Sequence, residues 1–270
     1  MPAVKLSFGA VLSESFGLFF ANLRLFFHLV TIPWIMSLGL RLMWSVLAQD
    51  SMIAMLVEKA LDVVPMVMFM VAWQRFVLLG PARVGRLPGL GWSGRETAWL
   101  LHLVKVAGVT FVLIGAFILT IGTTDIALLT PDGPIDPELA RRQALATPIG
   151  TGFMVSALLA LRVSWGLAAT AVDVPFSPRL SWVYSRGNAW TIIAALFLAF
   201  FVNAIATVVA TLFTLGIMRG IGAQEAAAVI TWTVALLVSY GGSALAATMQ
   251  AVIFRTLLGW REGAPLPATT

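Results

Sequence analysis

Six apolar segments, each about as long as a membrane-spanning helix, constrain the fold of this chain more than any other feature. They run from Leu25 to Ala48, from Ala60 to Gly80, from Val104 to Asp125, from Gly150 to Val172, from Trp190 to Ile217 and from Ala227 to Phe254. A helix that crosses the roughly 30 Å hydrocarbon core of a bilayer needs about 20 mostly apolar residues. The alternation of apolar and polar residues that is typical of barrel strands is missing from these segments. The sequence therefore predicts an all-α, polytopic bundle of six transmembrane helices.

The composition excludes an ordinary soluble domain. Charged residues make up 11% of the chain and hydrophobic residues 60%, whereas a soluble domain is about one quarter charged and roughly half apolar. The chain contains no cysteine, which excludes disulfides and thiolate metal sites. Its net charge of +5 fits the cytoplasmic loops of a membrane protein better than a nucleic-acid-binding surface. We therefore expect membrane lipids, and no nucleic acid, as partners.

The basic residues gather on one predicted side of the membrane. With the N-terminus inside, the cytoplasmic segments carry ten basic and four acidic residues, and the opposite segments carry four basic and eight acidic residues. The other three basic residues are Arg41, Arg75 and Arg162, which lie within the apolar segments. An excess of Lys and Arg is typical of short cytoplasmic loops. The pattern predicts a multi-pass protein with both termini in the cytoplasm.

An amphipathic helix followed by a helical hairpin recurs along the chain. The helical spacing of apolar residues in LSFGAVLSESFGLFFANLRLF predicts a helix that lies in the membrane interface before the first span. SPRLSWVYSRGNAW has the same character before the fifth span, and GWSGRETAWLLHLVK occupies the corresponding place before the third. Arg75, Arg162 and Arg255 each precede a glycine by about one helical turn. The three expected repeats cover residues 7–92, 93–180 and 181–259, and a flexible tail covers residues 260–270.

Polar side chains inside the apolar segments are the candidate ligand-binding residues, because ionisable groups are costly in hydrocarbon. The candidates are Arg41, Arg75, Arg162 and Arg255, with the amide side chains of Gln74, Asn203 and Gln250. A guanidinium beside amides would suit an anionic lipid headgroup or a carboxylate. Interhelical hydrogen bonding that only fixes the packing explains the same residues. Anchoring at the headgroup level is a further explanation for Arg75 and Arg255, whereas we expect Arg162 to face the bundle interior.

Residues for acid–base catalysis or metal binding are nearly missing. Asp62, Asp125 and Asp173 all lie at the ends of predicted spans, so no carboxylate pair lies inside the membrane. His28 and His102 have no adjacent carboxylate, and neither belongs to a metal-ligand motif. We therefore expect no catalytic residue, no metal and no cofactor. An enzyme would require His28, His102 and Asp173 to meet across the fold.

The segment SWVYSRGNAWTIIAALFLAFF places a Gly-Asn step between an aromatic-rich interfacial helix and a span. In this it resembles uncharacterised bacterial six-span integral membrane proteins. Residues 155–215 are also loosely similar to the membrane domain of some glycerophosphodiester phosphodiesterases. The resemblance implies a bacterial inner membrane and a six-helix bundle with interfacial helices. The soluble phosphodiesterase domain has no counterpart here, so its catalytic activity is not implied.

The sequence leaves two functions open. The first is a structural or accessory role with lipid-headgroup contacts at the cytoplasmic face. The alternative is a small transporter or channel for an anionic solute, lined by Arg41, Arg162 and their amide neighbours. A transporter would have a polar cavity near mid-membrane with Arg162 on its wall. An accessory protein would have a dry core of small residues and arginines at the level of the lipid headgroups.

Overall fold

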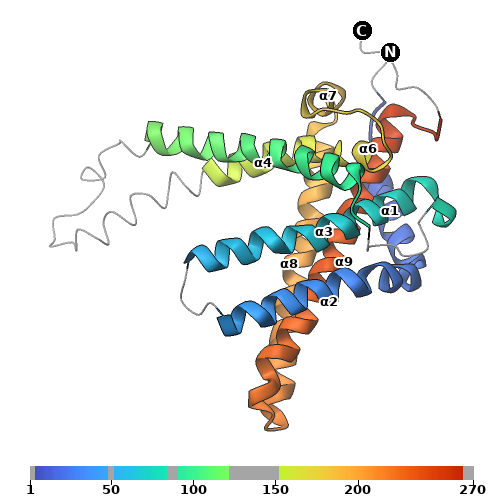
Figure 1. Cartoon of the computed structure of the whole chain (residues 1–270). Helices are drawn as coiled ribbons and strands as arrows, with labels where there is room; N and C mark the ends of the chain where they lie inside the picture. The colour runs from blue at the N-terminus through green and yellow to red at the C-terminus, as the bar shows by residue number, and fades with distance from the viewer. Residues whose placement is uncertain (1–3, 48–51, 84–90, 122–151, 264–270) are drawn as a thin grey trace.

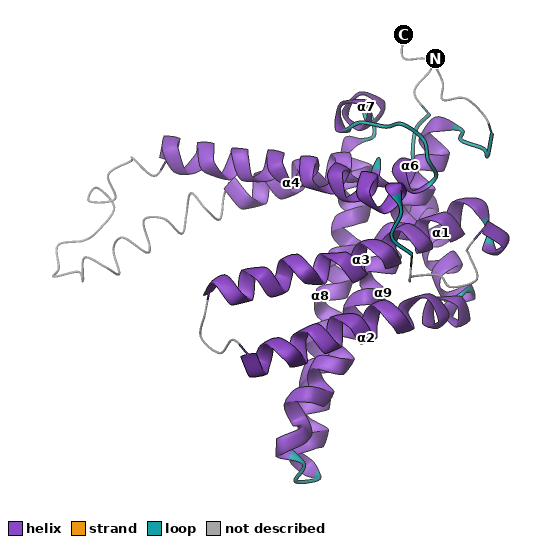
Figure 2. Ribbon diagram, in the orientation of Figure 1, coloured by secondary structure: helices purple, strands orange, loops and turns teal. Residues whose placement is uncertain are grey.

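The computed structural model describes residues 4–47, 52–83, 91–121 and 152–263, and every regular element in them is helical (Figure 2). The elements are α1 (Phe8–Ala21), α2 (Leu23–Leu47), α3 (Met52–Leu79), the 3-10 turn η1 (Pro81–Arg83), α4 (Gly94–Ile121), α6 (Leu167–Ala171), α7 (Pro178–Tyr184), α8 (Ala189–Gly220) and α9 (Gln224–Leu258). A further short apolar helix covers Gly152–Ser164. Residues 264–270 of the predicted tail lie outside the described residues.

Among the described residues, five helices are long and apolar enough to cross a membrane. The five candidate spans are Leu23–Ser45, Leu56–Leu79, Gly94–Ala116, Ala189–Gly220 and Ala226–Leu258. Their outward side chains are large and apolar, as with Trp190 and Phe213 of α8, which are 77% and 69% exposed. An apolar surface of this extent belongs against lipid rather than water. The chain is therefore a helical bundle of the multi-pass membrane class.

The fourth predicted span is not one continuous helix. The helix Gly152–Ser164 ends at a turn through Trp165 and Gly166, and α6 follows. The turn requires glycine, because a methyl group at Gly166 would overlap the Ser181 side chain and lie 2.9 Å from the Phe176 ring. The turn also buries the Trp165 ring completely. Thirteen residues of helix reach only about 20 Å, so a sixth full-length span is not confirmed.

The predicted interfacial helix before the third span is not a separate helix either. Its residues form the first turns of α4, which begins at a capping box. The Ser93 N–H donates to the Glu96 carboxylate at 2.8 Å, and the Arg95 N–H donates to the Ser93 hydroxyl at 3.2 Å. With its end capped, α4 starts at Gly94 and continues unbroken into the span. By contrast, α1 and α7 are separate helices before α2 and α8, so the threefold repeat is not confirmed.

Helix α9 is the centre of the bundle. It pairs with α8 and also contacts α1, α2, α3 and α6, and Figure 1 shows the α8–α9 pair crossing behind the α2–α3 hairpin. Residues 244–254 of α9 are all buried. Four alanines in this stretch let neighbouring helices approach closely. Three edge-to-face ring pairs between α2, α3 and α9 involve Phe26, Phe69, Trp73 and Tyr240.

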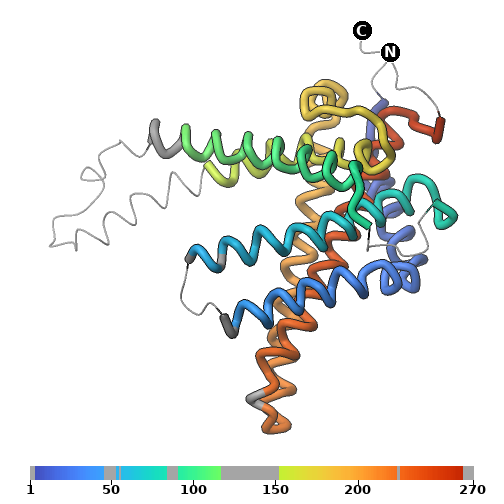
Figure 3. Tube along the Cα trace, in the orientation of Figure 1, coloured from blue at the N-terminus to red at the C-terminus, as the bar shows by residue number. Residues whose placement is uncertain are grey.

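The N-terminal segment of the described chain lies against the last two long helices. The Leu6 N–H donates to Asn188 Oδ1 at 2.8 Å, and Asn188 Nδ2 donates to the Val4 carbonyl at 2.8 Å. Arg255, near the end of α9, forms an ion pair with Glu14 of α1. In Figure 3, α1 (blue) lies beside the C-terminal end of α9 (red). The first helix is therefore packed against the last hairpin.

Candidate anion-binding site around Asp173

Asp173 follows α6 in a turn that directs its carboxylate toward α3 and α4. The Asp173 N–H donates to the Thr170 carbonyl at 3.3 Å, and the Val174 N–H donates to the Ala169 carbonyl at 3.0 Å. These two bonds form a Schellman motif, in which glycine usually takes the left-handed position. Asp173 takes it here, with φ 61°. Aspartate and asparagine tolerate this conformation better than most side chains.

Two arginines from different helices hold the Asp173 carboxylate. Arg95 of α4 donates from Nε to Oδ1 at 2.9 Å and from Nη2 to Oδ2 at 2.7 Å. Arg75 of α3 donates from Nη1 to Asp173 Oδ2 at 3.4 Å and to the Ala171 carbonyl at 2.9 Å. The hydrogen bonds from Arg95, together with the charge of Arg75, hold the pKa of the Asp173 carboxyl below its usual range. An ionised Asp173 therefore ties α3, α4 and α6 together at neutral pH.

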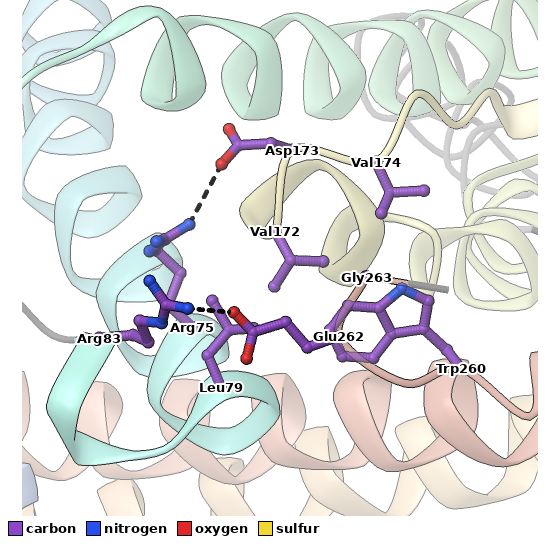
Figure 4. A pocket seen from close by; sticks show the side chains of 9 residues that line it. All are labelled: Arg75, Leu79, Arg83, Val172, Asp173, Val174, Trp260, Glu262 and Gly263. Atoms are coloured by element: carbon purple, nitrogen blue, oxygen red, sulfur yellow. Dashed lines mark hydrogen bonds and ion pairs between the residues drawn. The ribbon is translucent and has the colours of Figure 1, made fainter. Parts of the chain in front are cut away.

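A cavity of about 500 Å³ lies on the α3 side of Asp173 (Figure 4). Its polar lining comes from Arg75, Arg83, Asp173 and Glu262, and the Trp260 ring forms part of its apolar wall. Arg83 donates from Nη2 to Glu262 Oε1 at 2.7 Å, and both side chains are more than half exposed. Such an exposed pair contributes little stability, so an incoming anion can compete with Glu262 for Arg83.

A second cavity, of about 470 Å³, lies on the α4 side of Asp173. Helix α4 contributes Arg95, Ala98, His102 and Lys105, whose spacing of three and four residues places them on one helix face. Asp173 lines both cavities. We call the two cavities and their lining residues the Asp173 junction.

Cations outnumber anions at the Asp173 junction. Its charged lining consists of the four cations Arg75, Arg83, Arg95 and Lys105 and the two carboxylates Asp173 and Glu262. The nearby Glu96 carboxylate is engaged by the N-terminus of α4. Lys105 forms no hydrogen bond or ion pair with any residue that the structure describes. A partly buried excess of positive charge favours the binding of an anion.

Two of the candidates from the sequence, Gln74 and Gln250, meet in a buried chain of hydrogen bonds. Trp99 Nε1 donates to Gln74 Oε1 at 2.8 Å, and Gln74 Nε2 donates to Gln250 Oε1 at 2.8 Å. Gln250 Nε2 then donates to Ser164 Oγ at 3.3 Å. The chain joins α4, α3, α9 and the helix Gly152–Ser164. This is the interhelical hydrogen bonding that the sequence offered as the alternative to ligand binding.

Arg162 lies against α7 and not in the bundle interior. Its guanidinium carbon is 3.5 Å from the centroid of the Trp182 ring. It donates from Nε to Ser185 Oγ at 2.9 Å and from Nη2 to the Trp182 carbonyl at 3.4 Å. The predicted interior position is wrong, because the chain turns at Gly166 and brings α7 over this arginine.

The remaining candidates lie on different helices, and the two arginines among them are already paired. Arg41 pairs with Glu58 across the α2–α3 hairpin, with 3.7 Å between Nε and Oε1, and Arg255 pairs with α1. Asn203 lies against Gly242, where a methyl group would overlap the Asn203 carboxamide. Of the seven candidates, only Arg75 lines the Asp173 junction.

The three side chains that an enzyme would need do not assemble. His28 is exposed on α2, whereas His102 and Asp173 line the same cavity. No hydrogen bond joins His102 to Asp173 in the part of the chain that the structure describes.

Most charged residues of the junction were not among the candidates from the sequence. One signal could have singled out Asp173, since it is one of only four acids on the predicted basic side. No sequence signal pairs it with Arg75 and Arg95, which lie 98 and 78 residues away along the chain.

No family model matches this chain, and searches of curated proteins and of solved structures found no match. The resemblance of residues 155–215 to phosphodiesterase membrane domains stays a prediction. The site is therefore interpreted from its own geometry.

Proposed function

We propose that this chain is an accessory protein of a bacterial inner membrane, which binds anionic phospholipid headgroups at the cytoplasmic face through the Asp173 junction. The observation that carries the proposal is the excess of cations around two adjoining cavities. We assign it no catalytic residue, metal or cofactor.

The chemistry of the junction suits a phosphate group. Guanidinium and ammonium groups are the usual partners of phosphate oxygens, and the planar guanidinium can offer two parallel donors. Asp173 already orients Arg75 and Arg95. An anion that binds beside them therefore loses less side-chain entropy than one that must order free side chains.

The position of the junction suits a headgroup. Its arginines lie at the ends of two candidate spans, with Arg75 and Arg83 at the end of Leu56–Leu79 and Arg95 at the start of Gly94–Ala116. The end of a span lies near the boundary between hydrocarbon and headgroups. Basic residues at this level attract anionic lipids of the cytoplasmic leaflet.

We also propose that the chain crosses the membrane six times, with the Asp173 junction on the cytoplasmic side. Support comes from the Glu14–Arg255 pair, because it brings the first and the last helix of the described chain together at one side. A chain whose ends share a side crosses the membrane an even number of times. The helix Gly152–Ser164 with α6 then supplies the sixth crossing, and the basic residues at this end agree with a cytoplasmic location.

A repeat relationship between α1–α2–α3 and α7–α8–α9 also belongs to the proposal. Ser15 of α1 and Ser181 of α7 are both completely buried. Each lies seven residues before an asparagine, Asn22 or Asn188, that directly precedes the next long helix. In a third copy of the repeat, the interfacial helix would be continuous with the long helix α4.

The alternative, a transporter or channel for an anionic solute, has less support. Its proposed lining residues, Arg41 and Arg162, line neither cavity of the junction and are engaged by other side chains. The buried stretch of α9 is rich in alanine, as expected of a dry core.

Lipid binding to the purified protein tests the proposal. Native mass spectrometry would compare bound phosphatidylglycerol with bound phosphatidylcholine of the same acyl chains. We expect wild-type protein to prefer phosphatidylglycerol, and the double variant Arg83→Gln/Lys105→Gln to lose this preference several-fold. Arg75 and Arg95 stay unchanged because they hold Asp173.

The matched control is Lys5→Gln/Arg24→Gln, which removes one lysine and one arginine that are exposed elsewhere. It should keep the preference. Equal binding of the two lipids to wild-type protein, or an equal loss in both double variants, would overturn the proposal.

A further inference from the structure

The outer side of α7 carries basic and aromatic side chains. Helix α7 and the turn that follows it expose Arg179, Trp182 and Arg186. Their spacing of three and four residues places them on one helix face. The Arg186 N–H donates to the Val183 carbonyl at 3.2 Å, so the helical turn continues to this residue. Two guanidinium groups therefore flank an exposed indole ring.

Arg162 adds a third guanidinium to this face. Its cation lies over the Trp182 ring, and its bond to Ser185 Oγ brings it beside the residue that directly precedes Arg186. Two of its five N–H groups bond to α7, so three are left for a ligand. Because the guanidinium is already held in place, an anion that binds to it loses less side-chain entropy. We call Arg162, Arg179, Trp182 and Arg186 the α7 face.

The α7 face contains no carboxylate. Within the part of the chain that the structure describes, its three arginines form no ion pair. This differs from the Asp173 junction, where carboxylates compensate part of the positive charge. Three uncompensated cations attract a phosphate group and repel the ammonium group of a zwitterionic headgroup. The ligand is therefore a phosphate whose negative charge is not balanced within the same molecule.

The α7 face lies at the end of a candidate span. The span Ala189–Gly220 begins three residues after Arg186, and the helix that carries Arg162 ends two residues later, at Ser164. The end of a span lies near the boundary between hydrocarbon and headgroups. Tryptophan is enriched at this boundary, and Trp190 is exposed at the start of α8. The three arginines are therefore at the level of lipid phosphates.

An apolar track leads from this level along α8. Trp190, Ala194, Phe197 and Phe201 are exposed, and their spacing of three and four residues places them on one helix face. The rings of Phe197 and Phe201 are stacked, with their centroids 6.3 Å apart. From Trp190 to Phe201 the track is about 16 Å long, close to the roughly 15 Å of hydrocarbon in one leaflet. It matches an acyl chain, which a soluble anion or an acidic peptide lacks.

We infer that the α7 face binds the phosphate of an anionic phospholipid, with an acyl chain of the same lipid along the track on α8. This second lipid site shares no residue with the cavities of the Asp173 junction. It does not depend on the function proposed for the junction.

Fluorescence quenching at one position tests the inference. The chain contains no cysteine, so Ala194→Cys gives a single attachment point for a bimane fluorophore on the track. Lipids with brominated acyl chains quench the fluorophore when they lie against it. In phosphatidylcholine bilayers, brominated phosphatidylglycerol should quench several-fold more strongly than the same fraction of brominated phosphatidylcholine. Equal quenching by the two lipids would overturn the inference.

The labelled variant Arg179→Gln/Arg186→Gln should lose this preference and be quenched equally by both lipids. Both side chains are exposed and form no hydrogen bond among the described residues, so we expect the variant to fold. The matched control Lys5→Gln/Arg24→Gln removes the same charge elsewhere and should keep the preference. An unchanged preference in Arg179→Gln/Arg186→Gln, or an equal loss in the control, would overturn the inference.

Two further measurements separate this site from the junction and from soluble ligands. The junction variant Arg83→Gln/Lys105→Gln should keep the preference at position 194, and its loss there would contradict a separate site. Inorganic phosphate and polyglutamate should leave the quenching as sodium chloride of the same ionic strength does. If either one relieves the quenching further, the face binds a soluble anion, and the assignment to a lipid is wrong.

Discussion

The two ends of helix α3 lie in charged regions that differ in their net charge and in the volume of the adjoining cavities. Toward its N-terminal end the charges match, with Arg41 and Lys59 against Glu58 and Asp62, beside a cavity of about 160 Å³. At its C-terminal end the Asp173 junction has more cations than anions, beside cavities of about 500 and 470 Å³. Both regions contain arginine–carboxylate pairs. Unbalanced charge with room for a ligand is what distinguishes a candidate binding site from a packing contact.

The two regions also differ in the buried hydrogen bonds between their helices. Near the junction, Gln74 is bonded on both sides, to Trp99 and to Gln250. Near the balanced region, the Ser37 hydroxyl meets the Tyr240 hydroxyl at 2.8 Å. Loss of the Gln74 side chain leaves two groups without partners. Loss of the Tyr240 hydroxyl leaves Ser37 without a partner and removes a longer contact of 3.3 Å with the Pro33 carbonyl.

The largest difference is therefore expected between Gln74→Leu and Tyr240→Phe. Gln74→Leu should lower the free energy of unfolding by about 3 kcal/mol, because the Trp99 indole and the Gln250 carbonyl oxygen both lose a buried partner. Tyr240→Phe should cost about 1 kcal/mol, since Ser37 loses its partner and the Pro33 carbonyl loses only a longer contact. Unfolding titrations with SDS in mixed micelles would measure both. Similar losses would mean that the amide chain does not act as one unit.

A smaller contrast is expected between Asp173→Ala and Glu58→Ala. Asp173→Ala removes the acceptor of two arginines and places alanine at a positive φ, so we expect a loss of about 2 kcal/mol. Glu58→Ala removes a carboxylate that makes only longer, single contacts with Arg41 and Lys59, at 3.7 and 3.3 Å, so it should cost under about 1 kcal/mol. The same SDS titrations would measure the free energy of unfolding of both variants. A larger loss of stability in Glu58→Ala than in Asp173→Ala would contradict the comparison.

The smallest effect isolates the charge of Asp173. Asparagine tolerates the left-handed conformation, so Asp173→Asn should cost only about 1 kcal/mol at neutral pH. Because the folded protein lowers the pKa of Asp173, the stability from this charge is complete above the ordinary carboxyl pKa of about 4. It is lost as the pH falls through the lower folded value.

The difference in stability between wild-type protein and Asp173→Asn should therefore stay constant from about pH 7 to about pH 5 and shrink below about pH 4. Thermal unfolding of both proteins across this range measures it. A difference that grows on acidification would show that the arginines do not stabilise the carboxylate.

The long apolar spans could be predicted from the sequence, because their length and lack of charge leave few other folds. The site could not be predicted, because it depends on two local events without a periodic signal. The turn at Gly166 splits an apolar segment and brings α7 over Arg162. The Schellman motif then places Asp173 between arginines from two other helices. Composition identifies Arg75 as unusual, but only the fold supplies its partner.

The contact between Asn188 and the segment from Val4 to Leu6 has a consequence for biosynthesis. After Val4, a ribosome must add more than 180 further residues before Asn188 exists. During that interval α1 has none of its contacts with α8 and α9. Closure of the N-terminal end is therefore one of the last steps of assembly.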